Sequence, residues 1–248
     1  MELLAGFTAL QVGAALATAF VAAFIRGLAG FGMAILLVPV LALAVTPIEA
    51  VLLTNGVSVL IGLSDARMII RDSERSARMI AAWLVLSVAP GLWLLSITPP
   101  DIARVLIAFV ALSAFGAILL PQRAADLPGH LHTGATGIAT GLLTGFAGMP
   151  GPPVVPYYVG RAIPRHTAKA SMLLVFTIAS FTSIGSGFAL GVLEWHFLVL
   201  SALLYPAVLA GNWLGAKAFG KIDDKLWRGF VALLLATAAT VSLIKLLG

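Results

Sequence analysis

The chain has 248 residues, of which 60% are hydrophobic and 10% are charged, and its mean hydropathy is +1.07. Soluble domains carry about 25% charged residues, so this composition excludes an ordinary soluble protein and indicates an integral membrane protein. The absence of cysteine excludes disulfides, thiolate metal sites and cysteine nucleophiles, and the net charge of +5 resides in short loops between apolar runs, which indicates membrane orientation rather than nucleic-acid binding.

Continuously apolar stretches predict an all-α polytopic membrane protein, because the strands of a membrane barrel would alternate apolar and polar residues. Several stretches reach the ~20 residues that a helix needs to cross the hydrocarbon. The first has no basic residue before it and no cleavage site after it, which argues against a cleavable leader. In chain order the apolar segments are 7–25, 31–46, 48–66, 78–97, 102–120, 133–147, 151–160, 166–190, 196–215 and 226–247.

Three of these segments, 31–46, 133–147 and 151–160, are short for a full crossing. They adjoin glycine- and proline-containing stretches, which interrupt regular helices. We therefore expect broken or re-entrant helices at these places, and the number of full crossings stays open.

The basic residues predict the orientation. If every segment changes sides, one face receives thirteen Lys and Arg residues and the other receives Arg104 and Lys245 only. Because basic loops stay in the cytoplasm, the basic loops are expected to be cytoplasmic and both termini periplasmic. The thirteen residues are Arg26, Arg67, Arg71, Arg75, Arg78, Arg123, Arg161, Arg165, Lys169, Lys217, Lys221, Lys225 and Arg228.

The chain contains an internal repeat. Residues 27–39, rich in glycine and ending in proline, return as residues 145–156, and each copy is followed eight residues later by another proline. An alignment of Trp93 with Trp213 extends the similarity. We predict a first membrane repeat at 1–122, a connecting loop at 123–132 and a second repeat at 133–248. With five segments each, the two repeats would have opposite orientations, as in alternating-access carriers.

The repeated glycines are candidates for a binding site. A helix that starts inside the membrane leaves its first N–H groups without partners, and glycine allows an anion to approach them closely. This predicts substrate contacts at Gly30 and Gly32 in the first copy and at Gly148 and Gly151 in the second. Close packing of helices through small residues explains the same glycines equally well.

Polar residues inside the apolar segments are further candidates. Thr54, Asn55 and Ser171 are natural ligands for a polar substrate, although hydrogen bonds between helices would account for them as well. Arg26, beside the first glycine loop, is either a fixed charge for an anion or an anchor at the lipid headgroups. Lys169 has the same two interpretations, and its position near a segment end favours the anchor.

These residues resemble the sulfite exporter TauE/SafE family of membrane permeases. The resemblance rests on the two Gly-x-x-Gly loops, on Val38-Pro39 and Val155-Pro156 after them, and on the closing segment 211–217, and it covers nearly the whole chain. It implies transport of small anions such as sulfite, sulfonates or related organosulfur compounds across a bacterial inner membrane. Pro152 and Pro153 stand where the family commonly has extra glycines. This departure bears on which anion the chain prefers and not on its membership.

The predicted function is therefore a transporter, most simply an exporter, that binds an anion between the two glycine loops and works by alternating access. An anion-selective channel is the nearest alternative, because broken helices also build selectivity filters. An intramembrane enzyme is less favoured, since no nucleophile with a base, carboxylate pair or metal cluster stands inside a segment. The expected partners are a small anion and the lipid bilayer, with no cofactor and no nucleic acid, and a homo-oligomer stays open.

Overall fold

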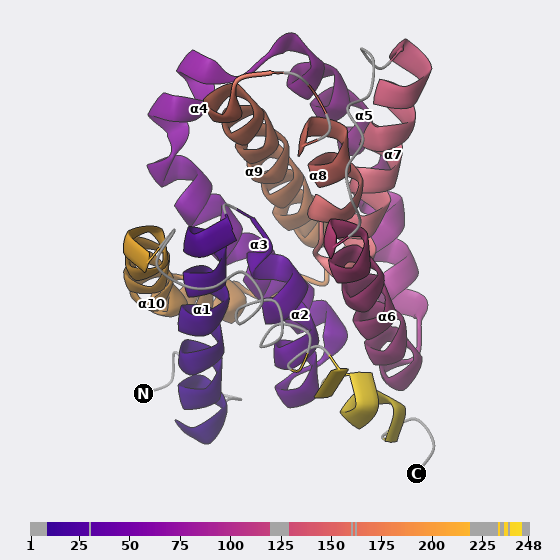
Figure 1. Ribbon diagram of the computed structural model, residues 1–248. Helices are drawn as coiled ribbons and strands as arrows, with labels where there is room; N and C mark the ends of the chain where they lie inside the picture. Colours follow the sequence, from indigo (N-terminus) through magenta and orange to yellow (C-terminus); the bar gives the residue numbers. More distant parts are fainter. Residues whose placement is uncertain are drawn as a thin grey trace.

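The computed structural model describes residues 9–29, 31–119, 129–159, 161, 163–218, 233, 236–237 and 239–244, and all the secondary-structure elements assigned in them are helices (Figure 1). The helices are α1 (Ala9–Ala29), α2 (Met33–Ala44), α3 (Pro47–Ser64), α4 (Ala66–Asp72), α5 (Arg75–Ile97), α6 (Pro100–Leu119), α7 (His130–Ala147), α8 (Gly151–Val159), α9 (Arg165–Ala189) and α10 (Trp195–Ala218).

The helices follow the apolar segments, which confirms the all-α prediction for the described residues and is consistent with a polytopic membrane protein. Four helices are long and apolar enough to cross a membrane, namely α3, α5, α9 from His166 and α10. The first nine predicted segments each contain a helix, whereas only 233, 236–237 and 239–244 of the tenth, 226–247, belong to the described residues. One difference is α4, a helix of 7 residues in the basic stretch between α3 and α5, where the sequence predicts a loop.

The chain breaks at both glycine loops. Helix α2 has 12 residues and α8 has 9, each too short for the ~20 residues of a crossing. Gly32 caps α2 with φ of 96°, and Gly148 ends α7 with φ of 66°. These left-handed conformations favour glycine, because a Cβ would clash with the backbone. The two loops therefore turn sharply where a larger residue would be strained.

The start of α3 is encoded locally. Thr46 caps the helix by accepting a hydrogen bond from the backbone N–H of Glu49, and the Glu49 carboxylate accepts one from the backbone N–H of Thr46 at 2.7 Å. Pro47 occupies the first helical turn, where its missing N–H costs nothing. The Glu49 carboxylate thus has a structural role at this helix end.

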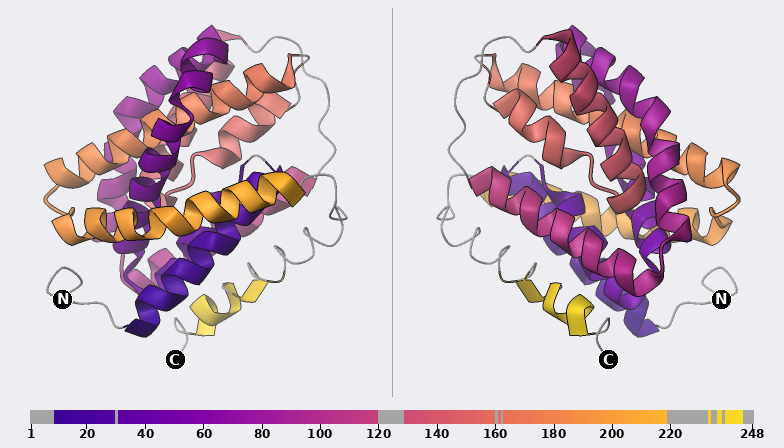
Figure 2. Two further views of the ribbon diagram at one scale, coloured as in Figure 1. Left: turned by 90° about the vertical axis from the view of Figure 1, so that its left-hand side faces the viewer. Right: turned by 90° about the vertical axis from the view of Figure 1, so that its right-hand side faces the viewer.

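Two pairs of helices make the most extensive contacts, α1 with α10 and α5 with α7 (Figures 1 and 2). Glycines lie in both seams. In the first seam, an added Cβ would overlap the backbone of the facing helix at Gly27, Gly211 and Gly215. In the second seam, the same holds at Gly91, Gly141 and Gly145. Small residues thus let the helix backbones approach closely.

The hairpins α1–α2 and α7–α8 place their breaks in the interior. In Figure 1, α2 lies in the lower part of the view and α8 in the upper part, with α3 and α9 beside them. A Cβ at Gly148 would meet Val38 of α2 at 3.0 Å and Val51 of α3 at 3.5 Å, so the second loop packs directly against the first half of the chain. This contact brings the two copies of the glycine motif together.

Candidate functional site

A cavity of about 60 Å³ lies between the two glycine loops. Its walls come from the end of α1, the start of α2, one face of α3, the second loop and one face of α9. A buried water needs roughly 10–15 Å³, so the cavity holds about four waters or one small oxyanion. The lining residues are Arg26, Phe31, Gly32, Met33, Ala34, Ile35, Ser58, Ile61, Gly62, Met149, Pro150, Gly151, Leu173, Phe176, Thr177 and Ser180.

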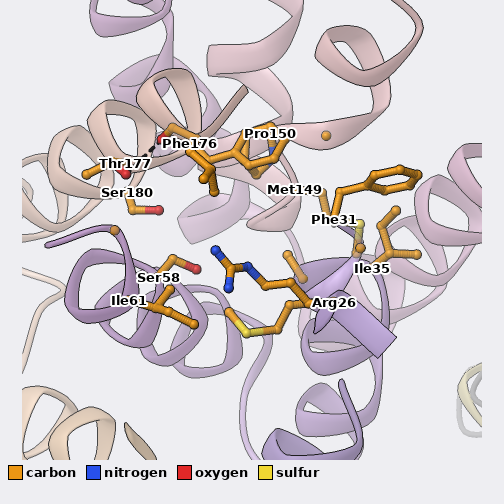
Figure 3. Close-up of a pocket in the computed structure, with 16 residues that line it drawn as sticks. Arg26, Phe31, Ile35, Ser58, Ile61, Met149, Pro150, Phe176, Thr177 and Ser180 are labelled. Carbon is orange, nitrogen blue, oxygen red and sulfur yellow. Dashed lines mark hydrogen bonds between the residues drawn. The ribbon is translucent and has the colours of Figure 1, made fainter. Parts of the chain in front are cut away.

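Arg26 is the charged residue of this lining. Its side chain is 10% exposed, and Figure 3 shows the guanidinium projecting into the space between Ser58 and Ser180. The α1–α10 seam positions it, because one Nη donates to Asn212 Oδ1 of α10 at 2.9 Å. The other Nη donates to Asp65 Oδ2, at the C-terminal end of α3, at 3.0 Å.

The Asp65 carboxylate neutralises the Arg26 charge. Burying an unpaired cation is costly, so this ion pair lets the arginine stay inside the bundle. A guanidinium has five N–H donors, and Arg26 uses two of them in these contacts with described residues. The remaining donors suit an oxyanion, which a planar guanidinium binds in a bidentate manner.

Hydroxyl groups complete the polar surface of the cavity. Ser58 comes from α3, and Thr177 and Ser180 come from α9. Thr177 Oγ1 donates to the backbone oxygen of Leu173 at 2.7 Å, which leaves its oxygen lone pairs as acceptors. The rest of the lining is mainly apolar, so polar contacts are few and directional, as in small-molecule sites generally.

Several residues predicted from the sequence line this cavity. Arg26, Gly32 and Gly151 belong to its wall, and Gly148 lies directly before the lining residues Met149 and Pro150. Gly30 lies outside the described residues.

Thr54 and Asn55 are placed differently. Both are buried in α3 and precede Ser58 by one helical turn, but neither is among the residues that line the cavity. The Asn55 amide donates to the backbone oxygen of Val51 at 2.9 Å and to Ser183 of α9 at 3.1 Å. Thr54 Oγ1 and Asn55 Oδ1 have no hydrogen-bond partner among the described residues. Asn55 thus joins α3 to α9, and both residues carry a polar atom without a described partner one helical turn from Ser58.

Ser171 and Lys169 lie away from this cavity. Ser171 Oγ accepts a hydrogen bond at 2.9 Å from the backbone N–H of Glu74, before α5, so it fastens α9 to that connection. Lys169 is exposed in the first turns of α9.

Ser58, Thr177 and Ser180 were not predicted as site residues from the sequence. A signal for Ser58 existed, because it follows Thr54 and Asn55 by four and three residues and so shares their side of a helix. For Thr177 and Ser180 the corresponding signal was a polar stripe along the long apolar segment of α9.

Broken helices that meet at a small cavity with a buried cation, inside a bundle of apolar helices, are the construction of a secondary membrane transporter. Residues 15–241 match the family described as Sulfite exporter TauE/SafE, and the chain belongs to this family of membrane transporters. The match covers most of the 248 residues and agrees with the resemblance based on the glycine loops. Comparisons with curated proteins and with solved structures found no significant match.

Proposed function

We propose that the protein exports small sulfur oxyanions, such as sulfite or short sulfonates, by alternating access through the cavity between the glycine loops. The observation that carries this proposal is the buried Arg26 guanidinium, which projects into a cavity lined by both copies of the repeated motif. The family's transport of sulfur anions agrees with a cation at this position.

The bound anion accepts hydrogen bonds from Arg26 and from the hydroxyls of Ser58 and Ser180. Gly32 exposes backbone N–H groups to it at the start of α2, where the helix dipole favours negative charge. At the start of α8 only the N–H of Gly151 is offered in the first three positions, because Pro152 and Pro153 have none. Because Asp65 pairs with Arg26, the anion competes with this carboxylate. That competition allows release as well as binding, which a carrier needs.

Alternating access requires two units that move against each other, and the helix seams support an inverted repeat of residues 1–122 and 133–248. Gly27 of α1 faces Gly215 and Ala216 of α10, and Gly145 of α7 faces Gly91 and Leu92 of α5. The first helix of each repeat thus packs against a helix of the other repeat, α1 against α10 and α7 against α5. The residues in contact occupy equivalent positions in the two seams. Rocking of one repeat against the other would open the cavity to each side in turn.

The proposed location is the bacterial inner membrane, with the basic loops in the cytoplasm and both termini in the periplasm. In this orientation a membrane potential of about 100 mV, positive outside, favours exit of an anion by about 2.3 kcal/mol per charge. Export is therefore favourable without a coupled cation.

The proposal is tested with purified protein in proteoliposomes. The wild-type chain should exchange labelled external sulfite for internal sulfite, with saturation, and Arg26→Gln should lower the exchange rate at least tenfold. Arg71→Gln is the matched control, because Arg71 pairs with Asp72 on α4, outside the cavity, and its side chain is 77% exposed.

Unchanged exchange in Arg26→Gln would remove the cavity from the mechanism. Steady anion current without exchange would show an anion-selective channel, the competing function that broken helices permit.

A further inference from the structure

A second cavity, of about 300 Å³, lies at the junction of α5, α7 and α8. Its lining shares no residue with the cavity between the glycine loops. Helix α8 connects the two, because Gly151 at its start lines the first cavity and Tyr157 lines the second. The six residue steps from Gly151 to Tyr157 correspond to roughly 9 Å along a helix axis. The lining residues of the second cavity are Arg75, Ser76, Met79, His130, Thr133, Tyr157 and Arg161.

The charge at this cavity is positive. Arg161 is held there by an ion pair with Glu74, and its side chain is 7% exposed. The Arg161 guanidinium also lies over the rings of Tyr157 and Tyr158, at 5.4 and 5.8 Å from their centroids. Arg75 is exposed and makes no hydrogen bond or ion pair with another described residue. Glu74 balances one arginine, so one guanidinium charge is left over.

Two helix ends add to this positive potential. Helix α5 starts at Arg75 and α7 starts at His130, and neither has a hydrogen bond from a capping side chain. The first N–H groups of such helices lack partners and favour anions. Two helix N-termini and two arginines therefore converge on one cavity.

Hydroxyl groups on the wall are held in fixed positions. Thr133 Oγ1 lies 2.9 Å from the hydroxyl of Tyr157, and Ser76 Oγ lies 2.8 Å from the hydroxyl of Tyr158. These contacts link α5, α7 and α8 around the cavity, so its shape is set by side chains of three helices. The charges of this pocket therefore stand on a wall whose side chains are fixed by hydrogen bonds, unlike charges that are merely close together on a surface.

We propose that this second cavity binds an oxyanion group, of the phosphate, sulfate or sulfonate class, at the junction of α5, α7 and α8. Arg75 supplies the free charge and Arg161 supplies a fixed guanidinium. The hydroxyls of Ser76 and Thr133 shape the wall, because Ser76 Oγ donates to the Glu74 carboxylate and Thr133 Oγ1 donates to the backbone oxygen of Gly129. The occupant is either a free solute or the phosphate of a lipid headgroup, which share this chemistry. The second cavity would also be a place where substrate binds before or after it occupies the first cavity. This role rests on the proposed function, whereas the binding of an oxyanion does not.

The experiment measures binding of inorganic phosphate to purified full-length protein by calorimetry, in the Arg26→Gln background, so that the cavity between the glycine loops contributes little. Phosphate should bind with saturation, and adding Arg75→Gln should raise the Kd at least tenfold. Arg78→Gln is the matched control, because Arg78 lies one turn along the same helix, is exposed, and does not line the cavity. His130→Gln, a second variant in the lining, should weaken binding by a smaller factor.

Equal Kd values for the Arg75→Gln and Arg78→Gln variants, or no saturable binding, would overturn the proposal. Failure of the proposed function would appear separately, as normal sulfite exchange in Arg26→Gln. Phosphate binding in nanodiscs of phosphatidylcholine, with and without phosphatidylglycerol, distinguishes a free solute from a lipid headgroup as the occupant. A free solute binds equally in both, whereas an anionic headgroup competes and raises the apparent phosphate Kd.

Discussion

At the scale of single residues, the proposed mechanism depends on the balance between Arg26 and Asp65, which would set how strongly the cavity attracts an anion. Asp65 is the more exposed partner, with 30% of its side chain accessible against 10% for Arg26. Water therefore screens the carboxylate, and the Coulomb attraction within the pair is moderate. In the proposed mechanism the pair holds the buried arginine in place, and an anion competes with its carboxylate.

Removing the carboxylate should strengthen anion binding. In Asp65→Asn the Arg26 charge is no longer neutralised, so the affinity for sulfite should rise by up to about tenfold, which corresponds to ~1.4 kcal/mol. Slower release should lower the exchange rate in proteoliposomes at the same time. Asp72→Asn is the control, because Asp72 pairs with Arg71 on α4 and does not line the cavity. Weaker binding in Asp65→Asn would mean that Asp65 orients Arg26 rather than competing for it.

At the scale of helices, the glycine seams set the register between the two halves. Gly91 faces Leu142 of α7 in the way that Gly215 faces Phe24 of α1. The packing therefore equates Gly91 with Gly215. The sequence alignment equates Trp93 with Trp213 instead, and the two alignments of the repeats differ by four residues, or about one helical turn. Both tryptophans are more than half exposed, at 53% and 57%, so they do not define the packing.

Small side chains added in the seams should therefore be costly. Gly91→Ala and Gly215→Ala should each lower the free energy of unfolding by about 1–3 kcal/mol, because a methyl group would push against a facing backbone oxygen. Gly116→Ala is the control, since a Cβ there meets nothing within 4 Å and alanine favours the helix by about 0.5–1 kcal/mol. Thermal unfolding in detergent measures all three, and a neutral effect in either seam would contradict the close approach.

At the scale of the whole molecule, the distribution of basic residues predicts which end faces the cytoplasm. Helix α5 is apolar, begins within the basic stretch at Arg75 and ends at Ile97. A single crossing by this helix places its two ends on opposite sides. Because the chain has no natural cysteine, single-cysteine variants report the sidedness without background.

In intact bacteria, a membrane-impermeant thiol reagent should label Ser96→Cys and should label Arg67→Cys only after the membrane is opened. Both positions are exposed at opposite ends of the α4–α5 region. The expected difference follows from retention of basic loops in the cytoplasm. Labelling of Arg67→Cys in intact cells, with protection of Ser96→Cys, would contradict the proposed orientation. The basic loops would then face the periplasm.

The local features of the chain were predictable from the residues. Apolar length defines the helices, and Thr46-Pro47-Ile48-Glu49 defines the start of α3. The breaks after α1 and α7 follow from glycine and proline, because these residues act on the backbone where they stand. The family could be named from the same motifs, and the match over residues 15–241 confirms it.

The composition of the site depended on packing across the chain. Hydroxyls and amides in an apolar segment look alike in sequence, and only the approach of α3 and α9 puts Ser58 and Ser180 on the cavity wall while Asn55 bonds to Ser183. Arg26 likewise receives its partners from α3 and α10, which lie 39 and 186 residues away along the chain. By itself, the sequence determined the membrane class, the helices and their breaks, since these follow from local backbone and hydropathy. The tertiary structure decided which polar groups face the cavity, because contacts between distant segments are set by how helices pack.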